Sequence, residues 1–115
     1  MSLENLHNVL YKPLLQAADM SVNSVTVDTA IQGITCYAIQ ANWSGFAGDA
    51  TARITTSGGN DSVNFTQVDS IIPTGTSGSY LLNVEKAGYR FIRLQYTQTG
   101  APVGTLSASI SGKVI

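Results

Sequence analysis

Hydrophobic and polar residues alternate along most of the chain from about residue 22 to its end. Side chains of a β-strand point alternately to opposite faces, so a period of two is typical of strands with one buried face. The clearest run is the last one, where Leu106, Ala108 and Ile110 alternate with Ser and Thr. Further runs lie at Val25–Val27, Tyr37–Trp43, Ala50–Ile54, Tyr80–Val84 and Ile92–Tyr96.

Turn-forming residues separate these runs at intervals of roughly 8 to 15 residues. The turns are Ser44-Gly45, Ser57–Asp61, Thr74–Gly78, Lys86–Gly88 and Thr99–Pro102. Short strands with this spacing predict an all-β fold, an antiparallel, jelly-roll-like β-sandwich of about seven or eight strands. A barrel satisfies the same spacing. No helix-length segment separates the strands, which excludes a parallel α/β sheet.

The first twenty residues follow a different period. Leu3, Leu6 and Leu10 fall at i, i+3 and i+7, which is the spacing of one helical face. Pro13 would end such a helix, because the residue before a proline resists helical geometry. We therefore expect a short helix or an ordered arm over residues 1–20 and the β-sandwich domain over residues 21–115. The arm could cover its own sheet edge or dock on a neighbouring subunit.

Charge is scarce in this chain. Charged residues make up 11% of the sequence and the net charge is −1, whereas an average soluble domain has about 25% charged residues. Surfaces of low net charge repel one another weakly, so we expect much of this surface to face other protein. A hydroxyl-rich β protein that is simply soluble has the same composition. The six Lys and Arg are scattered, so nucleic acid is not an expected partner.

The length of 115 residues suits a single domain. The single cysteine, Cys36, excludes an internal disulfide and lies in an apolar run, so we expect a buried, inert thiol. The start of the chain does not resemble a signal peptide, and no apolar run approaches the roughly 18 residues of a membrane helix. We expect synthesis in a host cytoplasm and no contact with a membrane.

No set of residues has the pattern of a catalytic or metal site. His7 is the only histidine and lies in the N-terminal arm, away from any candidate nucleophile. One Cys and one His cannot form a transition-metal site. The scattered acids are Asp49, Asp61, Asp69 and Glu85, all at strand ends or turns. They are the only support for a small hydrolase, so we expect no enzyme activity and no cofactor.

Two aromatic residues and one arginine are candidates for binding. Exposed together, Trp43 and Phe46 could stack on a sugar or fill a partner's pocket. The core of a domain this size needs large side chains, so a core position is favoured for Trp43, and Phe46 in its glycine-flanked turn is the stronger candidate. Arg93 lies in an apolar strand and should pair with an acid or face outward, since isolated burial of a charge is very costly.

The chain resembles small virion structural proteins of tailed bacteriophages over about residues 14–115. The segments that carry the resemblance are Leu15–Ser21, Trp43-Ser44-Gly45, Thr56-Ser57, Tyr89–Thr97, Gly104–Ala108 and Gly112-Lys113. The chain departs from the pattern after Thr56-Ser57, where Gly58–Asp61 follows without the expected downstream Trp, and Phe65 would stand in its place.

The resemblance implies a β-sandwich subunit of the virion that decorates a capsid or belongs to a tail or neck. It implies a homo-oligomer, for which we expect a trimer, and contact with other virion proteins, without enzyme activity. The residues expected at interfaces are Leu3, Leu6, Leu10, Trp43, Phe46 and Arg93. The alternative is a carbohydrate-binding β-sandwich module for attachment to a host surface, with glycans as partners.

Overall fold

The structure is a computed structural model that describes residues 10–22, 24–31, 33–48 and 51–113. These residues form eight strands and no helix. The strands are β1 (Leu10–Asp19), β2 (Ser24–Ala30), β3 (Cys36–Ala47), β4 (Thr51–Gly59), β5 (Thr66–Ile71), β6 (Gly78–Val84), β7 (Phe91–Thr99) and β8 (Val103–Lys113). Accordingly, the described part of the chain has no helix that could cross a membrane.

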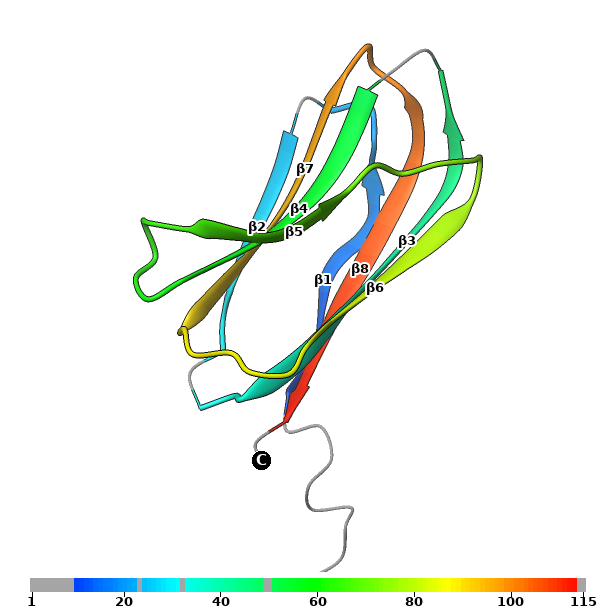
Figure 1. The fold of residues 1–115 in the computed structure, drawn as a ribbon. Helices are drawn as coiled ribbons and strands as arrows, with labels where there is room; N and C mark the ends of the chain where they lie inside the picture. The colour runs from blue at the N-terminus through cyan, green and yellow to red at the C-terminus, as the bar shows by residue number, and fades with distance from the viewer. Residues whose placement is uncertain (1–9, 23, 32, 49–50, 114–115) are drawn as a thin grey trace, which may run out of the picture.

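The strands form two four-stranded antiparallel sheets that face each other as two layers (Figure 1). The first sheet has the order β1-β8-β3-β6 and the second sheet has the order β2-β7-β4-β5. The chain crosses between the sheets at every connection except the one from β4 to β5, and this is the strand order of a jelly roll. The sequence prediction of an antiparallel β-sandwich is therefore confirmed.

The predicted N-terminal helix is not supported. Leu10 begins an edge strand that continues through Pro13, and Leu3 and Leu6 lie outside the described residues. Pro13 is compatible with this strand because β1 pairs only with β8, and a proline at a sheet edge removes no ladder hydrogen bond when its nitrogen faces away from the neighbour. Residues 10–19, which the sequence assigned to an arm, thus belong to the first sheet.

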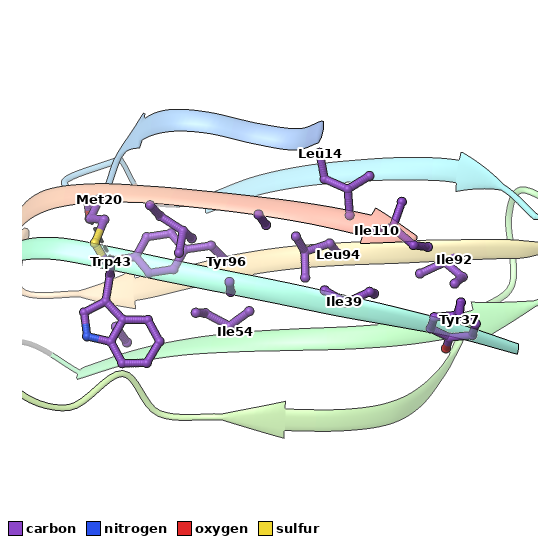
Figure 2. Close-up of a cluster of buried hydrophobic side chains, with 14 of the residues drawn as sticks. Leu14, Met20, Tyr37, Ile39, Trp43, Ile54, Ile92, Leu94, Tyr96 and Ile110 are labelled. Atoms are coloured by element: carbon purple, nitrogen blue, oxygen red, sulfur yellow. Dashed lines mark hydrogen bonds between the residues drawn. The ribbon is translucent and has the colours of Figure 1, made fainter. Parts of the chain in front are cut away.

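The core fills the space between the two sheets. In β3 the alternate residues Tyr37, Ile39, Ala41 and Trp43 are all buried, as the alternation predicted. Their counterparts from the other strands are Ala52, Ile54, Ile92, Leu94, Tyr96, Leu106, Ala108 and Ile110. Figure 2 shows Trp43 and Tyr37 towards opposite ends of this cluster, with Ile39, Ile54 and Leu94 between them. The strands that supply these residues therefore have one face committed to the core and one face available to solvent or partners.

A hydrogen bond bridges the two sheets along each side of the sandwich. On one side Lys12 of β1 donates from Nζ to Thr29 Oγ1 of β2, at 3.1 Å. On the other side the Tyr80 hydroxyl of β6 donates to a carboxylate oxygen of Asp69 in β5. These contacts place β1 beside β2 and β6 beside β5, so each side of the molecule presents one edge from each sheet.

Candidate interaction surface

The outer face of the first sheet carries no charged side chain across its middle. The strand registers place its outward residues in three rows that run from β1 or β8 to β6. We call these residues the first-sheet face: Tyr11, Ser111, Ala38 and Asn83; Pro13, Ser109, Gln40 and Leu81; and Ser107, Asn42 and Ser79. They alternate with buried core residues in β3 and β8, and with inward-facing residues in β1 and β6, so the same pattern that builds the core also builds this face.

The first-sheet face has large exposed side chains at its two margins and small side chains on its central strand β8. Tyr11 on β1 is 70% exposed and Leu81 on β6 is 58% exposed, while small serines occupy the central strand β8. Two register shifts in β1 open a groove of about 610 Å³ against β8. At the second shift the Ala17 N–H donates to Ser107 Oγ at 2.9 Å. The groove is lined by hydroxyl, amide and apolar groups, including Tyr11, Gln16, Asn42 and Ser109.

Charged residues lie at the two ends of the first-sheet face. Asp19 ends β1 and accepts hydrogen bonds from the Ser21 backbone N–H at 2.9 Å and the Ser21 hydroxyl at 2.8 Å. These bonds, the backbone one first, hold the pKa of Asp19 below its usual range. Lys113 ends β8. A partner seated on the centre of this face would therefore bury hydroxyl and amide groups, which lose less hydration energy than charges do.

The outer face of the second sheet is organised around an ion pair. Arg93 of β7 donates from Nε to one carboxylate oxygen of Asp28 in β2 at 2.7 Å, and from a guanidinium NH₂ to the other at 3.0 Å. The guanidinium also lies 4.2 Å from the centre of the Phe65 ring. The hydrogen bonds from Arg93 lower the pKa of Asp28. The expected pairing of Arg93 with an acid is confirmed, while its role at an interface stays a prediction.

The structure separates the other residues that the sequence proposed for binding. Trp43 is 6% exposed, with its indole N–H donating to the Thr74 carbonyl at 3.1 Å, so its ring is part of the core. Phe46 and Leu10 are half-buried and pack against that core. The expected exposed pair of Trp43 and Phe46 is therefore not formed. Cys36 is half-buried rather than buried, and its Sγ lies 3.8 Å from the Lys113 carbonyl.

Two of the acidic residues proposed for chemistry, Asp61 and Asp69, accept hydrogen bonds from neighbouring groups. Asp61 accepts the backbone N–H groups of Val63 at 2.9 Å and Asn64 at 2.6 Å, which lowers the pKa of Asp61, the Asn64 contact having the larger effect. Asp69 accepts the Tyr80 hydroxyl. His7 and Asp49 lie outside the described residues. Among the described residues no three His, Cys, Asp or Glu side chains are grouped as a metal site requires.

Sequence reasoning missed Tyr11 and the groove beside it. The signal was present, because Leu10, Lys12 and Leu14 fall on one side of a strand and leave Tyr11 and Pro13 on the other. The helical spacing of the three leucines and the proline hid this period of two. The bulges that open the groove have no sequence signature comparable to a glycine, since Ala17 itself adopts a φ of 50° there.

No family model and no curated protein matches this chain. Solved structures with the same fold do match. One is a subunit from Bacillus endospore appendages, described as disulfide-linked pili, with a TM-score of 0.57, 16% identity, and coverage of 95% of this chain and 91% of that one. A chitosan-binding module of a Paenibacillus chitosanase/glucanase has a TM-score of 0.54, 14% identity, and coverage of 91% and 96%.

A third similar structure is the VP2 subviral particle of infectious bursal disease virus. Its TM-score is 0.54 at 13% identity, and the match covers 91% of this chain but 32% of that one. The identities are low in all three comparisons, so the likeness concerns the β-sandwich fold alone.

Proposed function

We propose that this chain is a non-enzymatic structural subunit of a bacteriophage particle. It associates with its own copies, and it docks on the particle through the first-sheet face. The observation that carries the proposal is the absence of charge across the eleven residues of that face. Burying such a surface removes hydroxyl and amide groups from water but no ions, so the desolvation penalty is small and the lost hydrogen bonds can be replaced by a partner's polar groups.

The composition and the similar structures agree with this proposal. The net charge of −1 leaves little repulsion between crowded copies. A pilus subunit and a capsid protein share the fold, and both of those proteins belong to assemblies of many copies. A closed ring of three copies, located on the virion as a head decoration or a tail accessory, is the arrangement that we favour.

The test is particle association. Particles from cells that carry the encoding genome are purified on a density gradient, and the chain is quantified in the particle fraction. We expect the wild-type chain to sediment with particles and Ser109→Arg to be lost from them, since Ser109 lies at the centre of the first-sheet face. Thr55→Arg is the matched control, because Thr55 is a half-buried hydroxyl at the centre of the other face. A chain that is absent from particles, or equal loss of both variants, contradicts the proposal.

A second candidate function is binding of a neutral saccharide in the groove between β1 and β8. The exposed Tyr11 ring beside Gln16, Asn42 and Ser107 combines a stacking surface with uncharged hydrogen-bonding groups. The similar Paenibacillus module is named for chitosan, which is cationic, but this groove is lined by no carboxylate. A neutral glycan therefore suits it better.

A glycan array tests this alternative. Binding that is lost in Tyr11→Ala but kept in Leu81→Ala, an exposed apolar residue of the same face outside the groove, would support a saccharide site. Equal binding by both variants, or none by the wild type, would remove it.

A further inference from the structure

The four edge strands of the sandwich are not equally protected against pairing with another strand. An edge strand exposes backbone N–H and C=O groups on one side, and native proteins block such edges with bulges, prolines, short strands or inward-pointing charges. Here β1 and β6 are the edges of the first sheet, and β2 and β5 are the edges of the second sheet.

The edge at β1 carries several of these protective devices. It contains Pro13 and two register shifts against β8. It also contains Lys12, which pairs in register with the buried Ile110 and therefore points towards the interior side of the sheet, where it reaches Thr29. A strand that added to this edge would meet a kinked backbone and would trap the Lys12 charge.

The edge at β5 is protected by its irregularity. The strand has six residues, and a register shift between Thr56 and Ser57 of its neighbour β4 breaks the pairing. A short, bulged strand offers few consecutive backbone groups to a partner.

The edges at β2 and β6 carry none of these devices. Each strand has seven residues and pairs with its neighbour in unbroken register, β2 with β7 and β6 with β3. Neither strand contains Pro, Lys or Arg. The side chain–backbone hydrogen bonds identified within the described part of the chain involve backbone groups outside these two strands. Both edges therefore present a regular backbone to a partner strand.

The two open edges lie on opposite sides of the molecule and on different sheets. Lys12 and Thr29 join β1 to β2 along one side, and Tyr80 and Asp69 join β6 to β5 along the other. Each side therefore presents one open edge beside one protected edge. A single copy cannot satisfy both open edges by folding back on itself, but a second copy can meet either one.

We propose that β2 of one copy pairs with β6 of the next copy, so that the second sheet of one subunit continues into the first sheet of its neighbour. This inference rests on the self-association in the proposed function and names the surfaces that perform it. The outward residues of β6 are Ser79, Leu81 and Asn83, and those of β2 are Ser24, Thr26, Asp28 and Ala30. The single charge among them, Asp28, is already paired with Arg93, so the junction introduces no unpaired ion.

The pairing is heterologous, because each copy uses one edge to receive a neighbour and the other edge to extend. Heterologous contacts close into a ring if the rotation between copies allows it, and otherwise continue as a fibre. A ring of three would account for the expected trimer with the same contact.

The test introduces an inward-pointing lysine, like Lys12 of β1, into each of the two open edge strands. Val27 in β2 and Leu82 in β6 both pair in register with buried residues, Leu94 and Ile39, and are half-buried themselves. Val27→Lys and Leu82→Lys should each block one edge. The matched control is Leu10→Lys, a half-buried apolar residue on the edge that is already protected. Val25→Lys replaces Val27→Lys if circular dichroism shows that the latter does not fold.

Mass is measured by light scattering coupled to size-exclusion chromatography. We expect the wild type and Leu10→Lys to exceed the mass of one chain, and each blocked variant alone to be a monomer. An equimolar mixture of Val27→Lys and Leu82→Lys should form a dimer and nothing larger, because the one remaining open edge of each variant meets that of the other. This recovery also shows that both variants are folded.

Other outcomes overturn the inference and separate it from the proposed function. A wild type that is monomeric removes both self-association and the edge pairing, whereas particle association can still be observed independently. Blocked variants that assemble like the wild type leave self-association in place but exclude these edges. Blocked variants that each dimerise alone indicate symmetric pairing of like edges, and a folded mixture that stays monomeric excludes pairing of β2 with β6.

Discussion

The two outer faces of the sandwich have the same alternating backbone plan but use their polar residues differently. The first-sheet face has hydroxyl and amide groups without charge across its centre, and its relief comes from Tyr11 and Leu81 at the margins. On the second face Arg93 joins Asp28, contacts Phe65, and thereby ties β2 to β7 and the loop before β5. The second face carries charges, with Arg93 paired to Asp28 and Arg53 donating to Ser70 Oγ, whereas the first leaves its neutral polar groups open to a partner.

The largest expected effect on stability distinguishes an inward residue of β3 from its outward neighbour on the first-sheet face. Trp43→Ala should lower the free energy of unfolding by about 3–5 kcal/mol, because it removes a buried aromatic side chain and leaves a cavity. Its neighbour Asn42 points outward, so Asn42→Ala should change that free energy by less than about 0.5 kcal/mol. Urea unfolding followed by circular dichroism measures both.

The two variants define what the first-sheet face is for. A large loss of stability in Asn42→Ala would mean that this face stabilises the single chain. The first-sheet face would then have a role in folding, and its lack of charge would not by itself indicate a docking surface.

A smaller effect on stability is expected to distinguish β1, the irregular edge of the first sheet, from β2, the regular edge of the second. Ala17 has a φ of 50°, a left-handed conformation that is strained for residues other than glycine. Ala17→Gly should therefore raise the free energy of unfolding by about 0.5–1 kcal/mol. Ala30 lies in the regular edge strand β2, where Ala30→Gly should lower it by about 0.5–1 kcal/mol.

Thermal and urea unfolding should show that the free energy of unfolding rises in Ala17→Gly and falls in Ala30→Gly, if β1 is distorted and β2 is regular. Equal destabilisation by both glycines would show that the β1 bulge is not held in the left-handed conformation. The protective irregularity of that edge would then need another explanation.

The alternation of the sequence was enough to predict most of the fold, since β2, β3, β4, β6, β7 and β8 each contain a run with a period of two. Strand β5 has no such alternation. The alternation was also enough to favour a core position for Trp43 and to offer an acidic partner as one of two alternatives for Arg93. It could not identify that partner, because Asp28 lies 65 residues away and only the pairing of β2 with β7 brings the two together. The same limit applies to the first-sheet face, whose rows combine residues from four separate strands.

Strand β1 shows the other reason for failure. Its inner positions include Lys12 between Leu10 and Leu14, so the apolar alternation is interrupted by the charge that protects the edge. A device that prevents unwanted pairing therefore also weakens the sequence signal of the strand. The open edges β2 and β6, which lack such devices, were correspondingly easy to recognise as strands.

The smallest expected effect concerns the charges of the second face and depends on pH. Arg93 lowers the pKa of Asp28 in the folded protein below the ordinary value of about 3.9. The folded state therefore holds the proton more weakly than the unfolded state. The resulting stabilisation is fully present above that ordinary value and is lost as the pH falls through the lowered pKa of the folded state.

Unfolding measured from about pH 6 down to about pH 2 should show a steeper loss of stability for the wild type than for Asp28→Asn. Asp19 and Asp61 also have lowered pKa values and contribute to both curves, so the difference between the curves isolates Asp28. Raising the salt concentration should reduce this difference, because the pair is partly exposed and open to screening. In an Arg93→Gln background, Asp28→Asn should no longer alter the slope. If it still does, Asp28 is stabilised by something other than Arg93, and the Arg93–Asp28 pair is not the feature that distinguishes the second face from the first.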